Sequence, residues 1–483
     1  MGISGAISNA VSGLTAVGRG TQVVSSNLSN ALTPGYGKRE IQLSPRVYGN
    51  SGGGVRVDGI SRAVSDSALA AMRLSSASYG ESETRASYAA RVEKLVGTAT
   101  DPGSLGAQVA QLDKTLTDAI SRPDSEVRLN SAVNAARDLV NTINGIGRGI
   151  EQLRTDADSQ IATQVDTLNS AFEQVEDLNR KIVTELARTG DAASLMDQRQ
   201  KVIDDISSIL PIKALPREYG RIALFTEAGQ PLLDGSKPFR IGFNPAGIVT
   251  AEMSIEDGTL SGLTLDGEAP AAVQIKSLMG GTLGALFGAR DSTSVKMQAS
   301  IDAFAQELHA RFNDASMDPS LPPGGPGLFS DNGHLATATP GLALKLSLNP
   351  SVDPNQSGAV WRLRDGIGAT AQGPAGNSTL LAALSTKLNQ NTVPTSPALG
   401  TSSQSLSTIA GSLMTNAASA RVLADAAQSR SAANHSATTQ AVLAEGVDTD
   451  REMENLLMLE KAYAANARVI QTAFDMLDNI LRI

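Results

Sequence analysis

The sequence predicts a mainly α-helical protein with an inserted β domain. Apolar residues recur at alternating spacings of three and four at both ends of the chain, and residues 126–188 show helical periodicity almost throughout. Residues 212–275 instead combine Gly and Pro with short alternating apolar runs. Aromatic residues make up only 3% of the chain, which favours helices packed through small side chains. We expect terminal helices paired as a coiled coil, a helical-bundle middle domain, and a small β domain far from the termini.

The first helix is predicted from a heptad seam that starts near the N-terminus. Its main positions are Ile3, Ile7, Leu14, Val17, Val24 and Leu28. The periodicity stops just before Pro34, Gly35 and Tyr36. Proline lacks an N–H and disfavours helix at the residue before it, so the helix should end near Leu32. The loop formed by these three residues then leads the chain out of the coiled coil.

The last helix carries two adjacent apolar rows. The first row, expected to pair with the N-terminal helix, comprises Leu456, Tyr463, Ile470, Phe474, Leu477 and Leu481. The second row, expected to face a neighbouring subunit or a chaperone, comprises Leu459, Val469, Met476 and Ile480. A pair of ordinary amphipathic core helices is the alternative interpretation of the same spacing.

Glycine is frequent in the first helix, at positions 2, 5, 13, 18 and 20. Each glycine costs about 1 kcal/mol of helix stability relative to alanine. We therefore expect both termini to be mobile in the free subunit and to become helical when neighbours cover them.

The region between the two ends is predicted to be mostly helical. Ser65 or Asp66 can cap a helix, and another opens at Ser104 and ends before Pro123. Within the long helical stretch, Asn179 falls on an apolar seam. It is either a buried polar residue that fixes helix register, or a local slip turns Leu178 inward and leaves Asn179 in water.

These patterns divide the chain into discontinuous domains. The expected coiled-coil domain is 1–35 with 446–483, and the middle domain is 36–211 with 276–320 and 378–445. Residues 212–275 form the inserted β domain, and residues 321–377 are a loop- and strand-rich candidate for a second outer part. Because helices flank the inserted domain, its ends should be close together and its removal tolerated.

No enzymatic chemistry is predicted. The net charge of −9 argues against nucleic acid, and the absence of cysteine excludes disulfides and Cys-ligated zinc. His309, His334 and His435 are not at metal-ligand spacing. "DTDRE" at 448–452 begins like a calcium loop, but Met453 stands where such loops need glycine, so its acids more plainly suit a helix N-terminus. We expect no catalytic residue, cofactor or metal, and neither a membrane span nor a secretory signal.

Two terminal stretches resemble a known family. "NLSNALTPGYGKRE" at 27–40 and "LEKAYAANARVIQTAFDMLDNIL" at 459–481 resemble the N-terminal signature and the C-terminal helix of flagellar rod, hook and hook-associated proteins. Three further stretches resemble the hook-associated members of that family. They are "LMDQRQKVIDDIS" at 195–207, "GGTLGALFGAR" at 280–290 and "GVDTDREMENLLMLEKAY" at 446–463.

The resemblance implies a structural subunit of the bacterial flagellum at the junction between hook and filament, polymerising through its terminal helices. It implies a homo-oligomer with hook protein below and a second junction protein or flagellin above. It also implies a flagellar type III export chaperone and an extracellular location reached without a cleaved signal peptide. The alternatives are another axial protein, of the hook or distal rod, and an unrelated coiled-coil enzyme or adhesin.

Overall fold

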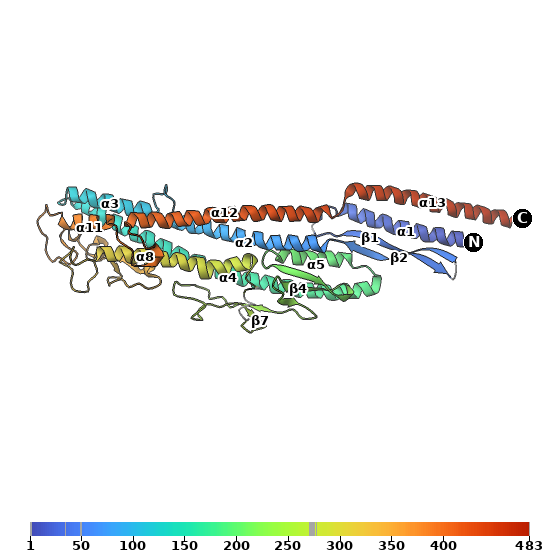
Figure 1. Ribbon diagram of the computed structural model, residues 1–483, viewed down its shortest axis with the longest axis horizontal. Helices are drawn as coiled ribbons and strands as arrows, with labels where there is room; N and C mark the ends of the chain where they lie inside the picture. The colour runs from blue at the N-terminus through green and yellow to red at the C-terminus, as the bar shows by residue number, and fades with distance from the viewer. Residues whose placement is uncertain (1, 34, 49–50, 270–275, 277, 483) are drawn as a thin grey trace.

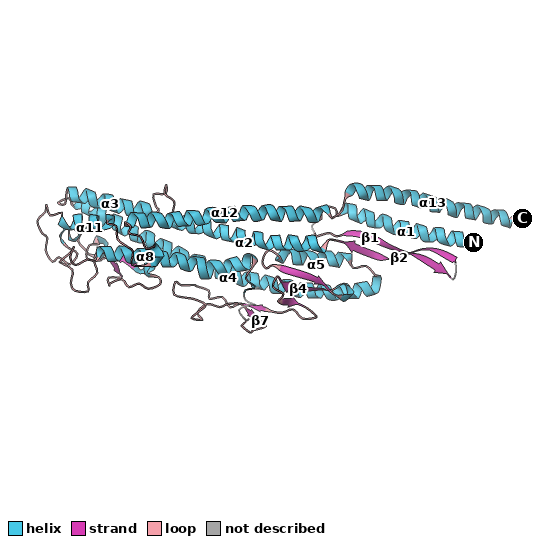
Figure 2. Cartoon of the chain, viewed as in Figure 1, coloured by secondary structure: helices cyan, strands magenta, loops and turns pink. Residues whose placement is uncertain are grey.

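The computed structural model describes residues 2–33, 35–48, 51–269, 276 and 278–482. The molecule is long and narrow, with both chain ends at one end of it (Figure 1). Helices make up most of the chain and the strands are short, apart from one hairpin (Figure 2). The predicted fold class, mainly α with a small inserted β region, is therefore confirmed.

The two terminal helices lie side by side at the end that holds the termini (Figure 1). They are α1 (Ile3–Ser29) and α13 (Thr449–Leu481), and α1 also packs against the antiparallel hairpin of β1 (Lys38–Tyr48) and β2 (Ser51–Ala63). The side chain of Asp448 caps α13 by accepting the N–H groups of Asp450 and Arg451. The acidic stretch at 448–452 thus forms a helix N-terminus, where negative charge is favoured.

The rest of the molecule, which we call the body, is built on long helices. Ser65 and Ser104 cap the first two of them with their hydroxyl oxygens. The glycines at 145–149 do not interrupt the longest helix, and Gly149 allows Leu95 to approach its backbone. The body helices are α2 (Asp66–Val96), α3 (Leu105–Ser121), α4 (Glu126–Thr189), α5 (Ala193–Ile206), α7 (Gly281–Gly288), α8 (Ser294–Phe312), α11 (Thr379–Asn389) and α12 (Leu406–Ala444), with a π-turn at Ala289–Thr293.

The end opposite the termini contains the largest apolar core. Side chains of α3, α4, α8 and α11 meet there with those of residues 328–367. That segment contains β8 (Phe329–Asp331) paired with β9 (Leu346–Leu348), the short helices α9 (Leu342–Lys345) and α10 (Arg362–Asp365), and single turns at Pro354–Gln356 and Pro397–Leu399 nearby. Residues 328–367 therefore contribute to the body core, which differs from the outer segment expected for 321–377.

The inserted β region lies along the flank of α4 and α5, not at the end opposite the termini (Figure 1). It has an antiparallel sheet of β3 (Ile212–Pro216), β4 (Ile222–Thr226) and β5 (Pro231–Leu233), a turn at Glu218–Gly220, and the pair β6 (Ile241–Gly242) with β7 (Thr264–Leu265). Its buried side chains, among them Leu224 and Leu233, share one core with Phe172 of α4. Removing the region would therefore uncover part of the core around Phe172, and the expectation that its removal is tolerated stays a prediction.

Side-chain amides of α4 hold the main chain of this region. Asn179 donates to the carbonyl of Ile222 at 2.9 Å and accepts its N–H at 3.1 Å. Asn169 makes the same pair of bonds with Ile241, at 2.7 and 2.9 Å. Each amide thus makes the pair of main-chain hydrogen bonds that a neighbouring strand would otherwise make. Asn179 is buried, as one of the two alternatives required, and its partners are the main chain of Ile222 in β4 and the side chain of Arg199 in α5.

Two buried arginines complete the attachment. Arg154 donates to the carbonyls of Thr250 and Met253 at 2.6 and 2.7 Å. Arg290 is 0% exposed and forms an ion pair with Asp158 at 2.6 Å. Because a buried charge is costly without partners, these residues tie α4, the inserted region and the π-turn into one unit.

Helix α12 has two unlike halves. Its first half buries Leu406, Ile409, Ala410, Leu413, Met414 and Ala417 in the body, and no later residue of the helix is buried. The second half lies antiparallel on α2 through polar contacts. Examples are Ser75 with Thr438 at 2.6 Å, the stacked rings of Tyr79 and His435, and Arg421 with Glu93 at 2.5 Å.

Candidate functional site: a polar cluster at the base of the terminal helices

The terminal helices run antiparallel and touch at intervals of seven residues. A Cβ on Gly13 would lie 2.8 Å from Asn466 Oδ1, and one on Gly20 would lie 3.1 Å from Leu459 Cδ2. One heptad further, Asn27 donates to Glu452 Oε2 at 3.1 Å. The missing side chains at 13 and 20 therefore allow the two backbones to approach each other closely.

The predicted seam residues of α1 have different environments. Val17 and Val24 are buried, and Ile3, Ile7 and Leu14 are half-buried. Leu28 is 38% exposed, because Asn27 occupies the inward position next to it. The inward face of α1 is also wider than one seam, since the hairpin covers its other side.

The predicted rows of α13 are mixed in the structure. From the first row, Leu456, Ile470 and Leu477 are half-buried, whereas Tyr463, Phe474 and Leu481 are exposed. From the second row, Leu459 lies against Gly20 of α1, which differs from its expected outward position. Val469, Met476 and Ile480 are exposed. The face of α13 that lies towards α1 thus contains residues from both predicted rows.

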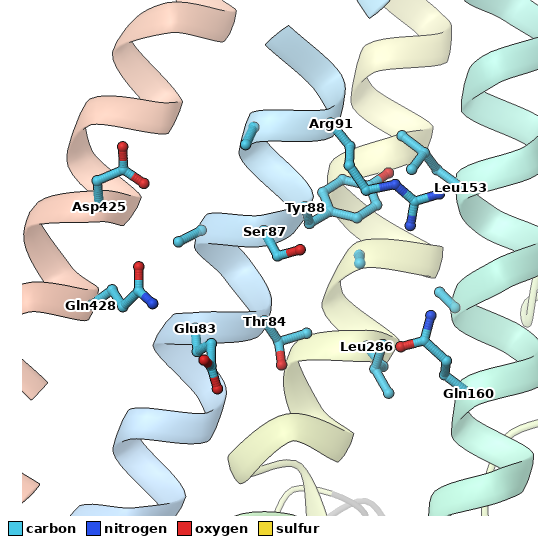
Figure 3. Close-up of a pocket in the computed structure, with 14 residues that line it drawn as sticks. Glu83, Thr84, Ser87, Tyr88, Arg91, Leu153, Gln160, Leu286, Asp425 and Gln428 are labelled. Carbon is cyan, nitrogen blue, oxygen red and sulfur yellow. The ribbon is translucent and has the colours of Figure 1, made fainter. Parts of the chain in front are cut away.

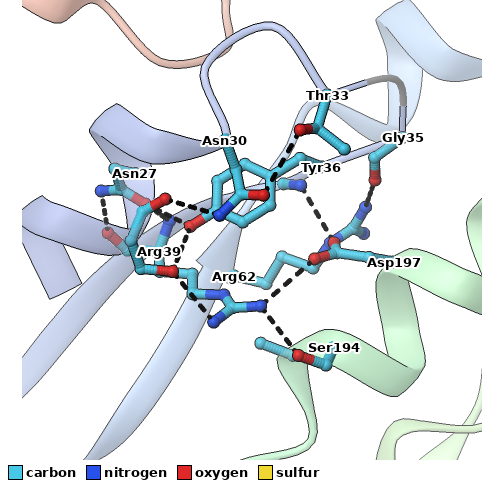
Figure 4. Close-up of polar contacts among 12 residues, drawn as sticks. Asn27, Asn30, Thr33, Gly35, Tyr36, Arg39, Arg62, Ser194 and Asp197 are labelled. Carbon is cyan, nitrogen blue, oxygen red and sulfur yellow. Dashed lines mark hydrogen bonds and ion pairs between the residues drawn. The ribbon is translucent and has the colours of Figure 1, made fainter. Parts of the chain in front are cut away.

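The loop after α1 folds back onto the helix it leaves. Pro34 lies outside the described residues. Gly35 has φ +80°, a left-handed conformation that favours glycine, and Tyr36 returns towards Asn27 (Figure 4). Gly37 is buried, and any Cβ there would collide with the guanidinium of Arg62.

Asn27 is the centre of a set of polar contacts that we call the polar cluster, formed with Tyr36, Arg39, Arg62, Asp197 and Glu452 (Figure 4). Its amide nitrogen donates to the Arg39 carbonyl at 3.0 Å as well as to Glu452. Its Oδ1 accepts the Tyr36 hydroxyl at 2.9 Å and the Arg39 N–H at 3.0 Å. All four hydrogen-bonding positions of this buried amide are therefore occupied.

Asp197 connects the loop to α5 of the body. One carboxylate oxygen accepts the Gly37 N–H at 2.9 Å and Arg62 Nε at 2.6 Å. The other lies 3.5 Å from Arg39, which also donates to Ser194 at 3.0 Å. Arg62 further bonds Gln200. Charge-assisted bonds of this kind hold the terminal helices and the hairpin to one face of α5.

The other face of α5 is anchored in the body. Arg199 donates to Asn179 Oδ1 at 2.6 Å and to the Gly220 carbonyl at 2.7 Å, and burial lowers its pKa to about 10. Arg73 donates to Asp204 at 2.6 Å. Burial raises the pKa of Asp204, and Arg73 opposes this effect. Helix α5 thus joins the terminal helices and the β1–β2 hairpin to α2 and α4.

Burial also affects the aromatic member of the cluster. The pKa of Tyr36 is raised by burial, an effect that its hydrogen bond with Ser26 and the nearby Arg39 oppose. The Arg39 guanidinium carbon lies 5.1 Å from the centre of the Tyr36 ring. Tyr36 therefore stays neutral and acts as a hydrogen-bond donor to Asn27.

Sequence reasoning did not single out Asn27 or Asp197, and it assigned Glu452 only to the acids at the N-terminal end of the last helix. All three lie inside stretches that carry the family resemblance, at 27–40, 195–207 and 446–463. Asn27 lies beside the predicted seam residue Leu28, so the apolar periodicity gave no signal for it. The structure brings these three distant stretches together at one place.

The site has no features of a catalytic or metal centre. Within the described ranges, no group of His, Asp and Glu could hold a metal ion, and no helix is long and apolar enough to cross a membrane. A hollow of about 560 Å³ lies where α12 passes α2 (Figure 3). Glu83 and Asp425 line it on one side and Arg91, paired with Asp156, on the other. These groups form no nucleophile–base pair.

Two protein families match this chain. Residues 89–318 match the family described as Flagellar hook-associated protein FlgK helical domain. Residues 439–483 match Flagellar basal body rod FlgEFG protein C-terminal. Flagellar hook-associated protein 1 of Salmonella typhimurium is 23% identical over an alignment that covers 100% of this chain and 100% of that protein. The chain is therefore similar along its whole length to flagellar hook-associated protein 1.

Two further similarities are partial. The alignment with Flagellar hook-associated protein 1 of Escherichia coli, 22% identical, spans 54% of this chain and about half of the relative, 49%. The flagellar hook junction protein FlgK from Burkholderia pseudomallei has a solved structure that is 22% identical, with a TM-score of 0.43 over 55% of this chain and 46% of the other. The first family match runs from α2 to just beyond α8, and the second covers α13. Both family descriptions and the names of these relatives are those of flagellar proteins, and the protein is a component of the bacterial flagellum.

Proposed function

We propose that this chain is a structural subunit of the junction between hook and filament. The proposal is supported by similarity along the whole chain to hook-associated proteins 1 and by the surface of the last helix. That surface is the observation that carries the argument. Phe474 is 58% exposed and Leu481 is 81% exposed, and Leu457 and Met453 on the same helix are also exposed.

A row of large apolar side chains in water marks a surface that another protein covers. Burying apolar area contributes about 25 cal/mol per Å², so covering this row would stabilise an assembled subunit strongly relative to a free one. The terminal helices would therefore polymerise with those of neighbouring subunits in the axial structure. The body would lie outside them, attached through α5.

The expected partners follow from position in the axial structure. Other copies of this chain would complete the ring, with hook protein below and a second junction protein or flagellin above. Before export, a flagellar type III export chaperone would shield the exposed residues Val469, Met476 and Ile480. The protein would then act outside the cell, exported without cleavage of a signal peptide.

A complementation experiment tests this function. We expect a strain that carries Ile470→Ala with Phe474→Ala to form hooks that lack filaments and to lose flagellin to the medium. Arg468→Ala with Asp475→Ala changes exposed polar side chains of the same helix and should leave filaments normal. Normal filaments from the apolar variant, at wild-type protein levels, would contradict the proposal.

The deletion strain separates this role from that of another axial protein. Hooks without filaments support the junction role. Loss of the hooks themselves would instead indicate a hook or distal-rod subunit, a role favoured only by the match of residues 439–483 to the rod family. Electron microscopy of the cell surface distinguishes the two results.

A further inference from the structure

We infer that the contact between Asn27 and Glu452 sets the register in which the two terminal helices pair. Three contacts recur at seven-residue intervals along this pair: Gly13 with Asn466, Gly20 with Leu459, and Asn27 with Glu452. Only the third of these involves a hydrogen bond between the helices. Asn466 donates instead to the carbonyl of Ala462 in its own helix, at 2.9 Å.

The first two contacts discriminate poorly between registers. Gly13 and Gly20 present no side chain, so either can lie opposite a leucine, an alanine or an internally bonded asparagine. The buried apolar residues of α1 are small and repetitive: Ala10, Ala16, Val17, Val23 and Val24. Such a surface is similar after a displacement of one heptad, and a single polar position is the usual device that fixes register in paired helices.

Asn27 is suited to this role because it cannot turn away. The N–H and carbonyl of Arg39 and the hydroxyl of Tyr36 occupy three of its four hydrogen-bonding positions. Its remaining N–H points at one place on α13. Glu452 fills that place with a side chain that is 3% exposed, and its other oxygen lies 3.8 Å from Lys38.

A displacement of α13 by one heptad would remove this match. Asn27 would face Leu459, Gly20 would face Asn466, and Gly13 would face Ala473. The last N–H of Asn27 would have no acceptor, and Glu452 would lose both Asn27 and Lys38. Unsatisfied buried polar groups are costly, so this register is disfavoured although its apolar contacts are acceptable. The second half of α12, which precedes α13 in the chain, buries no residue and is held to α2 by polar contacts.

The absence of cysteine makes the register measurable in the purified full-length chain. The pair Gly13→Cys with Asn466→Cys reports the observed register. The pair Gly20→Cys with Asn466→Cys reports the displaced one. In the observed register the second pair is separated by about 10 Å along the helix axis, too far for a disulfide. Both pairs share one cysteine position, so they are matched reporters.

We expect only the first pair to form a disulfide when the rest of the sequence is unchanged. In the double variant Asn27→Leu with Glu452→Leu, two leucines can face each other in either register. The displaced disulfide should then increase about tenfold or more relative to the unchanged background. Glu452→Gln keeps an acceptor for Asn27, and we expect it to retain the observed register.

Three results would overturn the inference. The first is found in the double-leucine variant: the disulfide that reports the displaced register stays at its original level, while the disulfide that reports the observed register still forms. The second is loss of both disulfides, since the contact would then be needed for pairing and not for register. The third is a displaced disulfide in Glu452→Gln. If the double variant does not fold by circular dichroism, Asn27→Ala replaces it with the same expected increase. Because every readout is a register in free protein, failure here would leave the proposed junction role intact.

Discussion

The body of the molecule and its terminal helices differ in how completely their apolar side chains are covered. Phe304 of α8 is 0% exposed, whereas Phe474 of α13 is 58% exposed. On α13 the buried residues are Glu452 and Ala473 alone among those described. The body therefore has a complete core in the free subunit. The terminal helices cover only part of their apolar side chains, and their contacts to the body are mostly polar.

Helix α12 shows the same difference within one element. Its first half is anchored by leucine, isoleucine and methionine, and its second half by hydroxyl groups and ion pairs. Polar contacts specify geometry but add little net stability, about 1 kcal/mol each. We therefore expect the body to fold on its own and the terminal helices to depend on assembly for most of their stability.

Hydrogen exchange should show the largest difference between the two regions. Body amides, such as those at 130–145 in α4, should exchange only through global unfolding, which costs about 5–15 kcal/mol. Amides 5–30 of α1 should exchange much faster in the purified monomer, because little apolar area is covered there. Strong protection of α1 in free protein would remove the distinction between the regions.

Truncating one phenylalanine in each region should give unequal losses. Phe304→Ala should reduce the free energy of unfolding by about 3–5 kcal/mol, because it leaves a cavity in a closed core. Phe474→Ala should change the same quantity by less than about 0.5 kcal/mol, as is usual for exposed positions. Urea unfolding followed by circular dichroism measures both. Equal losses would mean that α13 is part of the same cooperative core.

Asn179 tests the polar attachment of the inserted region to α4. Asn179→Ala should reduce the free energy of unfolding by about 1–3 kcal/mol, because the N–H and carbonyl of Ile222 and the Arg199 guanidinium lose their partner. Asn134→Ala is a suitable control, since that residue lies on the exposed face of the same helix. A loss no larger than that of the control would show that water replaces the amide.

His309 should make the free energy of unfolding of the body depend on pH. We expect this effect to be smaller than those of the substitutions above. Its Nδ1 lies 2.9 Å from the Phe329 carbonyl, and its Nε2 accepts the N–H of Ala336 at 3.3 Å. This arrangement suits the neutral ring, and burial lowers the pKa of His309. The unfolded chain binds a proton near pH 6.5, so stability should fall as pH drops below that value.

The measurement is urea unfolding at pH 7.5 and 5.5, compared between the unchanged chain and His309→Gln. The unchanged chain should lose more stability at the lower pH than the variant does. If both lose the same amount, the pH dependence comes from other groups.

Local patterns predicted the elements well but not their neighbours. The periodicity placed a helix at 126–188, and α4 spans Glu126–Thr189. Ser104 was recognised as a cap because capping depends on residues close in sequence. The core position of residues 328–367 was missed. It depends on distant contacts such as Arg137 with Asp353 and Asn144 with the carbonyl of Ala343, which leave no periodic signal.

The polar cluster was predictable only as a set of segments. The family-like stretches marked where to look, but Asn27, Asp197 and Glu452 are far apart in the chain. Periodicity treats apolar residues as inward and polar ones as outward, so it placed Leu28 at the seam. The structure buries Asn27 instead, because that amide has four partners that come from β1, the loop and α13.

The hydrogen bonds between α4 and the inserted β region have a consequence for how the exposed side chains of that region can vary. Asn169, Asn179 and Arg154 hold main-chain groups, which every amino acid carries. The outward side chains of the region, such as Ile248 at 74% exposed, take no part in this attachment. Their chemistry can therefore change without releasing the segment from the helix. We expect this flank to be a permissive site, where a foreign epitope or a new surface charge leaves the fold of the body unchanged.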